Sequence, residues 1–248
     1  MSAFARNLGV SLAVSVFAAG SAFAQSPAWK NTAEIYMMGA SMSGTTAVGP
    51  VEAQLDVTFK TVLENLQFGA MVNYRGEAPK WAVTADVMFS ALGATRDGTH
   101  GLQTTKVDAD EWLVNLTGSW RASEIFDVFA GVRFTSISDT VVLTPFTGNV
   151  RTGKLSKSWF DPIVGARVKA PIGKGWSLEG YGDIGGFSVG SDLTWMLQGR
   201  VNWQMSRTVG LGLGYRALYQ DYESGSGTDY FKWKITTQGP LLAANLSF

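Results

Sequence analysis

Nine charged side chains stand at alternate positions between apolar residues, a spacing that would place them on one face of a β-sheet. An unpaired charge in a narrow interior is costly, so these side chains need partners of opposite sign. Two roles stay open for them. They could line a constriction that filters small solutes and favours anions, or form a structural ion-pair network that fills an interior too narrow to conduct. The nine are Asp86, Arg133, Asp161, Arg167, Lys169, Glu179, Asp183, Arg200 and Arg216.

Acid–base catalysis would depend on a single histidine. His100 stands in the polar run Asp97-Gly98-Thr99-His100, and it could act as a general base only with a serine or carboxylate within about 3 Å. The sequence has no matching motif, and a solvated loop histidine is the other interpretation. The chain also has no cysteine, which excludes thiolate chemistry. We therefore expect a protein that is not an enzyme and takes no cofactor.

Two weaker patterns could concern ligands. The acidic run 108 to 111 could hold a divalent cation, but a solvated strand end has the same composition, and we predict no metal site. The segments 180 to 182 and 210 to 212 contain the G-x-G fragment of phosphate-binding loops. No helix follows either segment, so we favour glycines that relieve crowding where strands curve.

The elements that position these residues are predicted to be strands. From Leu193 to Met205 the odd positions are apolar or aromatic, apart from one glycine, and the even positions include polar residues. Such alternation is typical of a half-exposed strand, and it recurs along most of the chain. The chain has 20 basic and 20 acidic residues among 248, so the formal net charge is zero and a nucleic-acid binder is excluded.

The spacing of aromatic residues distinguishes a membrane barrel from a soluble sandwich, which shows the same alternation. Four pairs of aromatic residues lie on the apolar face, eight residues apart. Eight residues rise about 20 Å in a tilted strand, close to the height of the apolar band between two lipid–water interfaces. The predicted girdle comprises Trp81, Phe89, Trp112, Trp120, Phe126, Phe134, Trp195 and Trp203.

The turns predict an all-β fold, a closed antiparallel transmembrane β-barrel of about ten strands, with eight or twelve as alternatives. Short and long connections alternate, as periplasmic turns and outward loops do in outer-membrane barrels. The expected strands are 33–43, 66–75, 80–94, 106–120, 126–142, 156–170, 176–188, 192–204, 208–222 and 229–248.

Two segments depart from this regular pattern. Residues 44 to 64 alternate and then resemble one helical turn, so we read them as an outward loop that forms either a ribbon above the membrane or a plug in the lumen. The last strand changes phase, because Phe231 and Ile235 are odd whereas Leu242 is even. We predict a β-bulge at residues 238–240 that restores the outward face.

Both chain ends indicate export to a membrane. Residues 1–24 read as a cleaved signal peptide, with Arg6 ahead of an apolar run and Ala22-Phe23-Ala24 as the cleavage site. The mature chain, 25–248, has no further apolar run of 18 residues. The terminal Phe248 resembles the signal that the barrel-assembly machinery recognises in outer-membrane proteins.

Several runs resemble a group of small bacterial outer-membrane β-barrels, related to OmpA, OmpX and OmpW. They are residues 159–167, 182–187, 190–195, 213–216, 56–59 and 63–66. The resemblance covers most of the mature chain and implies a scaffold in the Gram-negative outer membrane, with no catalytic residue. We expect envelope structure or limited porin-like passage of small solutes, in contact with membrane lipids and lipopolysaccharide. An outer-membrane protease or lipid hydrolase with its active site in the outward loops is the alternative.

Overall fold

The computed structural model describes residues 29–97, 102–145, 147 and 149–248. The expected signal peptide and His100 lie outside these residues. Twelve strands and two short helices form within them. Their bounds are β1 Lys30–Met38, β2 Ser41–Val48, β3 Val51–Val57, α2 Phe59–Asn65, β4 Leu66–Glu77, β5 Trp81–Asp97, β6 Leu102–Arg121, β7 Phe126–Pro145, β8 Arg151–Gly173, β9 Trp176–Gly186, β10 Leu193–Gln204, β11 Val209–Ser224, η1 Gly227–Asp229 and β12 Phe231–Ser247.

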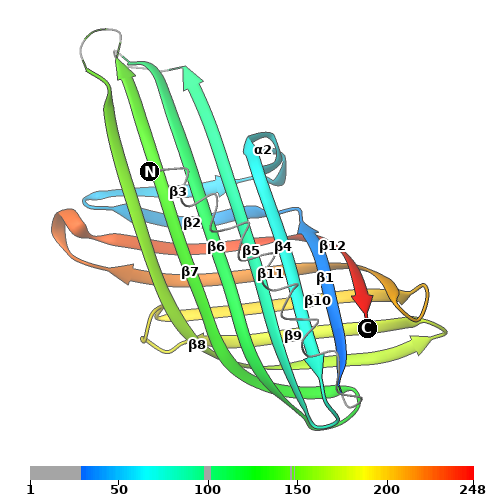
Figure 1. Ribbon diagram of the computed structural model, residues 1–248. Coiled ribbons are helices and arrows are strands. Elements are labelled where there is room, and N and C mark those ends of the chain that lie inside the picture. Colours follow the sequence, from blue (N-terminus) through cyan, green and yellow to red (C-terminus); the bar gives the residue numbers. More distant parts are fainter. Residues whose placement is uncertain (1–28, 98–101, 146, 148) are drawn as a thin grey trace.

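The sheet closes on itself because its first and last strands pair (Figure 1). The order runs from β1 to β4 and then through consecutive strands to β12, which pairs with β1 from Thr32–Ser247 to Met38–Leu241. All neighbours are antiparallel. The ring therefore contains ten strands, β1 and β4 to β12, while β2 and β3 extend the sheet beside it. The predicted closed antiparallel barrel of about ten strands is confirmed.

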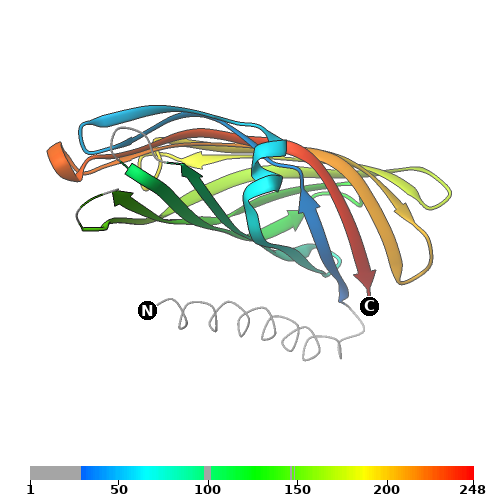
Figure 2. The ribbon, with the colours of Figure 1, turned by 90° about the horizontal axis from the view of Figure 1, so that it is seen from above.

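One end of the barrel carries tight turns and both ends of the described chain. The backbones of Asn31 and Phe248 exchange two hydrogen bonds there, of 3.0 and 2.9 Å. Figure 2 shows the start of β1 beside the C-terminus. The connections at the opposite end include the β2–β3 ribbon and α2. Since the strand count is even, both ends of the described chain lie on the tight-turn side.

Period two sets the two faces of the wall. On β10, Leu197 is 58% exposed on the outer face, whereas its neighbour Met196 is 2% exposed and points inward. The same alternation holds on β7, where Asp127, Phe129 and Arg133 are buried. The apolar residues of the sequence pattern are therefore the exposed ones, and the polar residues face the lumen.

The segment 44–64 forms a ribbon and a helix beside the ring. β2 pairs with the first half of β12, from Phe231–Val48 to Gln238–Ser41, and β3 pairs back onto β2. The chain then forms α2 before it enters β4. Among the described residues, no helix is long and apolar enough to span a membrane.

The predicted bulge at residues 238–240 is wrong. β12 keeps one register with β11 from Phe231–Ser224 to Leu246–Val209, without a shift. Phe231, Ile235 and Leu241 all point inward, each 1% exposed. The phase changes because the first half of β12 lies beyond the apolar band, where the inward face is apolar and the outward face carries lysines.

Beyond the apolar band the wall divides into two parts that pack face to face. In Figure 1 the upper parts of β5 to β8 run at an angle to β2, β3, β11 and β12. Ile137 and Trp159 from the first part contact Phe231 from the second in a buried apolar cluster. The ring of Trp159 also stacks on Tyr222 at 4.1 Å. Above the band, apolar burial replaces the ion pairs of the lumen.

Candidate functional site

The outer face carries aromatic side chains at two levels. At the loop end, paired strands bring Phe89 within 4.5 Å of Trp112 and Phe134 within 4.8 Å of Phe160, measured between ring centroids. Trp195 continues this outer belt beside Tyr219, at 5.9 Å.

The inner belt lies at the tight-turn end. Trp81 pairs with Trp120 in register, Trp176 stacks on Trp203 at 5.7 Å, and Phe126 is exposed on the same face. All eight residues of the predicted girdle thus lie on the outer face, four in each belt. The structure adds four aromatic residues that have no aromatic partner eight positions away in the sequence, namely Phe68, Phe160, Trp176 and Tyr219.

An exposed apolar band joins the two belts. Its residues include Val164, Leu197 and Leu213, of which Leu213 is 64% exposed. A soluble protein rarely exposes a continuous apolar band of this kind, whereas a strand in lipid must present one. The fold and its outer face therefore define a membrane-spanning β-barrel.

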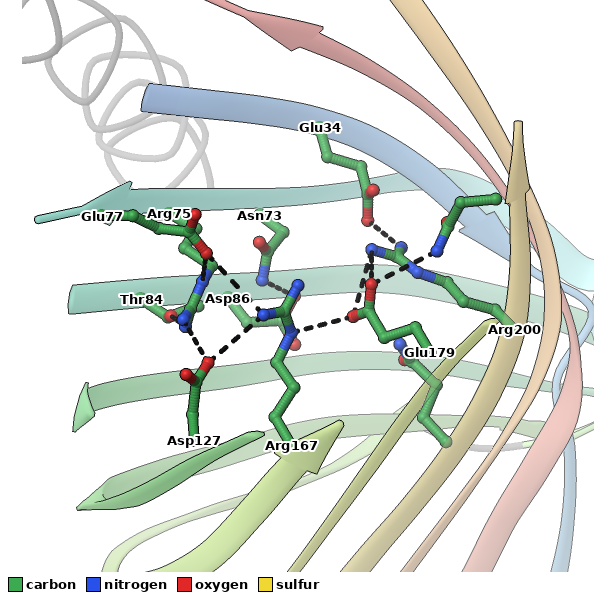
Figure 3. Close-up of polar contacts among 12 residues, drawn as sticks. Glu34, Asn73, Arg75, Glu77, Thr84, Asp86, Asp127, Arg167, Glu179 and Arg200 are labelled. Atoms are coloured by element: carbon green, nitrogen blue, oxygen red, sulfur yellow. Dashed lines mark hydrogen bonds and ion pairs between the residues drawn. The ribbon is translucent and has the colours of Figure 1, made fainter. Parts of the chain in front are cut away.

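The inner face holds the first part of the ion network near the tight turns (Figure 3). The Arg75 guanidinium binds Asp127 and Glu77, each at 2.6 Å. Arg167 bridges Asp127 at 3.3 Å and Glu179 at 3.1 Å. Each carboxylate thus contacts more than one cation or donor, which offsets the cost of burying it.

Arg200 extends the network across the lumen to β1. Its guanidinium binds Glu34 at 2.6 Å and Glu179 at 3.2 Å (Figure 3). Lys169 pairs in register with Glu179 and lines the same space, but its side chain is exposed.

A second group of contacts lies around Asp86. Arg216 binds this carboxylate at 3.2 Å and donates to the Tyr36 hydroxyl at 2.8 Å, which in turn donates to Asp86 at 2.9 Å. Asn73 and Asn115 also donate to Asp86, at 3.3 and 3.4 Å. The Asp86 carboxylate therefore accepts hydrogen bonds from donors on several strands.

Arg133 and Asp183 form a pair with no solvent-exposed side-chain surface, at 2.7 Å. Arg133 also donates to Asn115 at 2.8 Å and to Thr194 at 2.7 Å, and the Tyr181 hydroxyl donates to Asp183 at 2.8 Å. These contacts join β6, β7, β9 and β10 across the interior.

Asp161 is the one carboxylate of the predicted set that forms no ion pair in the described structure. It lies opposite Arg133 in register, yet its carboxylate accepts from the Ser191 backbone at 2.5 Å and from the Ser191 hydroxyl at 2.9 Å. The Trp159 indole donates to it as well, at 3.1 Å. Asp161 therefore fastens the β9–β10 turn and does not belong to the charge network.

Sequence reasoning missed several polar members of the lumen, among them five ionisable residues on β1, β4 and β7. Two of them, Glu34 and Tyr36, alternate along the strand with the apolar, outward Ile35 and Met37. This alternation could have identified both as inward residues. The other three stand next to tight turns, where a charged residue is also typical of a solvated strand end. They are Arg75, Glu77 and Asp127.

An apolar layer closes the interior at the level of the outer belt. Met88, Leu113, Met196 and Leu218 form it, each directly next to an aromatic residue of that belt in the sequence. Below the layer lies a polar cavity of about 130 Å³, which reaches Lys30 and Ser247 at the tight-turn end and Met196 at its top. The lumen is thus a pocket that ends inside the barrel.

The weaker ligand patterns do not converge. Asp108 and Asp110 share the outward parity of Trp112, whereas Glu111 points inward, so the acidic run is split between two faces. No group of three or more potential ligands suited to a metal ion occurs in the described part of the chain.

The glycine segments also lie on opposite faces. Segment 180–182 places its glycines outward and segment 210–212 places them inward. Gly214, two residues further on, lies where a Cβ atom would meet the Cβ of Arg200 at 2.4 Å. Glycine at this inward position makes room for a lumen cation.

Two carboxyls beyond the outer belt face the inside of the upper part. Burial raises the pKa of Glu111 to about 7, and the charge of Asp139 adds to the shift. Burial likewise raises the pKa of Asp139 to about 6, with Asp110 contributing. Both carboxyls therefore hold their protons more tightly than a free carboxyl does.

Comparison with known proteins gives a likeness in fold alone. No protein-family model and no curated protein matches the chain. The attachment invasion locus protein Ail of Yersinia pestis aligns over 89% of this chain and 99% of its own, with 9% identity and a TM-score of 0.40. Neisserial surface protein A aligns over 89% and 97%, with 10% identity and a TM-score of 0.34. A Pseudomonas aeruginosa FadL homologue aligns over 89% and 90%, with 8% identity and a TM-score of 0.37. Ail and the Neisserial protein are small outer-membrane β-barrels, the group that the sequence resembles.

Proposed function

We propose that the protein is an integral outer-membrane β-barrel with a structural role, in which a closed barrel anchors the β-sheets that extend beyond the outer belt. In this proposal the protein is not an enzyme and conducts no solute. Its partners are membrane lipids, lipopolysaccharide and, during biogenesis, the barrel-assembly machinery that recognises Phe248.

The closed cross-section at the outer belt carries this proposal. The layer of Met88, Leu113, Met196 and Leu218 crosses the lumen from β5 and β6 to β10 and β11. The Arg133–Asp183 pair and its partners fill the space beside β7 and β9, and neither side chain of the pair is accessible. A solute that entered the polar cavity would have to displace both groups.

The outer face and the positions of the described chain ends support the proposed outer-membrane location. The apolar band between two aromatic belts fits a bilayer core, and both ends of the described chain lie on the tight-turn side, as in outer-membrane barrels. The extended sheets then lie on the extracellular side.

Limited passage of small solutes is the second candidate, favoured by the polar cavity of about 130 Å³ and its charged lining. Methionine side chains are flexible, so a rearrangement of Met88 and Met196 would be the least costly way to open the layer.

Planar-bilayer recording of the refolded mature protein distinguishes the two candidates. We expect no unitary conductance for the natural chain, and discrete steps only after Met88→Gly and Met196→Gly together remove half of the layer. Leu197→Gly, on the outer face of β10, is the matched control and should stay silent. Regular conductance steps from the natural chain would contradict the closed-barrel proposal.

A further inference from the structure

The barrel wall contains a seam between β1 and β4. These strands pair from Lys30–Glu77 up to Tyr36–Met71, and no further. Above this point β1 passes through Gly39 and Ala40 into β2, which follows β12, while β4 continues to Leu66 beside β5 alone. The upper edge of β4 therefore has no strand partner on the β1 side within the described structure.

Helix α2 lies at this seam (Figures 1 and 2). It joins the end of β3 to the start of β4, and the Thr58 hydroxyl caps it by accepting from the Thr61 amide at 3.3 Å. The Phe59 ring lies over Gly39, where an added Cβ would meet it at 3.1 Å. The ring thus covers the point where β1 passes into β2.

The helix is amphipathic, and its apolar face is partly exposed. At about 100° per residue, Phe59 and Leu63 lie within about 40° of each other around the axis. They are 46 and 57% exposed. Lys60 and Glu64 occupy the other side and pair at 3.7 Å. None of the seven helical residues is buried, so the described protein covers the apolar face only in part.

The apolar face adjoins the outer face of the barrel. Gly39 has the outward parity of Ile35 and Met37, which are 62 and 66% exposed, and a Cβ atom added at Gly39 would meet the Phe59 ring. The apolar face is therefore next to the surface already assigned to lipid. A helix this short is not stable in water alone and needs an apolar surface or medium beside it.

We propose that the apolar face of α2 binds acyl chains of the membrane lipid, so that helix and lipid together close the seam between β1 and β4. This inference rests on the membrane location in the proposed function. It adds a lipid-binding surface at a defined position in the wall, where the hydrogen-bonded sheet is interrupted.

The chain contains no cysteine, so single labels test this proposal directly. We would attach a nitroxide to Leu63→Cys in vesicles of phosphatidylethanolamine and phosphatidylglycerol, and measure its collisions with oxygen and with a water-soluble nickel complex. The ratio of oxygen to nickel accessibility should be several-fold higher at residue 63 than at Lys60→Cys, the matched position on the polar side.

Leu213→Cys, on the apolar band, is the reference for membrane embedding. A label at 213 that collides mainly with nickel would overturn the proposed membrane location itself. A lipid-exposed label at 213 with an aqueous label at 63 would overturn only the role of α2. A label at 63 shielded from both agents, with spin–spin broadening relieved by unlabelled protein, would mean that a second copy covers this face and would equally overturn it.

Discussion

Arg133 and Asp183 show how much of the lumen depends on single side chains. Sequence parity was enough to predict that both point inward, but it could not predict their pairing. Arg133 lies opposite Asp161 in register and binds Asp183 on another strand. Arg133 binds Asp183 because its side chain is long enough to reach that strand, and because Asp161 already accepts a hydrogen bond from Ser191. Pairing across a closed lumen is thus a three-dimensional property that alternation does not encode.

Removing one partner of this pair should be strongly destabilising. Arg133→Ala leaves Asp183 buried without its cation, which should lower the free energy of unfolding by about 3 to 5 kcal/mol. Urea unfolding in lipid vesicles measures the change. Lys60→Ala, which breaks an exposed pair, should cost less than about 1 kcal/mol, and equal losses for the two variants would contradict the assigned network.

The carboxyl of Glu111 should make stability depend on pH. Its pKa is raised from 4.5 to about 7, so the folded protein holds this proton more tightly than the unfolded chain does. Stability should therefore fall as the pH rises from about 4.5 to 7, and it should be recovered on acidification.

Glu111→Gln removes that charge and should raise the free energy of unfolding by about 1 to 3 kcal/mol at pH 8, with little effect at pH 4. Unfolding curves at the two pH values check this result, with the exposed Glu52→Gln as the control. An equal effect at both pH values would argue against a buried charge at residue 111.

The strands themselves were largely predictable, because alternation and turn residues are local properties. Each of the ten expected strands overlaps a strand of the ring, although β8 begins at Arg151, earlier than expected. The phase change in β12 does not produce the predicted bulge, for a physical reason. Alternation reports which face is apolar, and that face switches from outside to inside where a strand leaves the lipid. The sequence did not decide where residues 44–64 lie, because the partner of this ribbon, the first half of β12, is distant in the sequence.

The boundary where the strands leave the lipid predicts how well the outward faces of β7 and β10 tolerate a charged residue. Leu197→Arg, midway between the belts, should destabilise the protein in bilayers by about 2 to 4 kcal/mol, whereas Ser138→Arg, outward but beyond Phe134, should cost at most about 1 kcal/mol. Equilibrium unfolding in vesicles compares the two. A larger cost at residue 138 would place the lipid boundary elsewhere.

The whole molecule combines a closed lower barrel with two packed sheets beyond it. Ion pairs surround the polar cavity of the lower lumen, Met88 and Met196 help close it at the outer belt, and the cluster around Ile137 joins the sheets above. The interior is therefore cross-linked between strands, whereas the outer face and the extended sheets carry exposed side chains. This division of the molecule is what the proposed structural role requires.

The most direct test of this account is a scan of nitroxide labels along β11, from Val209 to Tyr219, in phospholipid vesicles. The account predicts that oxygen accessibility alternates with period two, high at odd positions such as Leu211 and Leu213, and low at even positions such as Arg216. An alternation of opposite phase, or uniform accessibility to the water-soluble nickel complex, would contradict it.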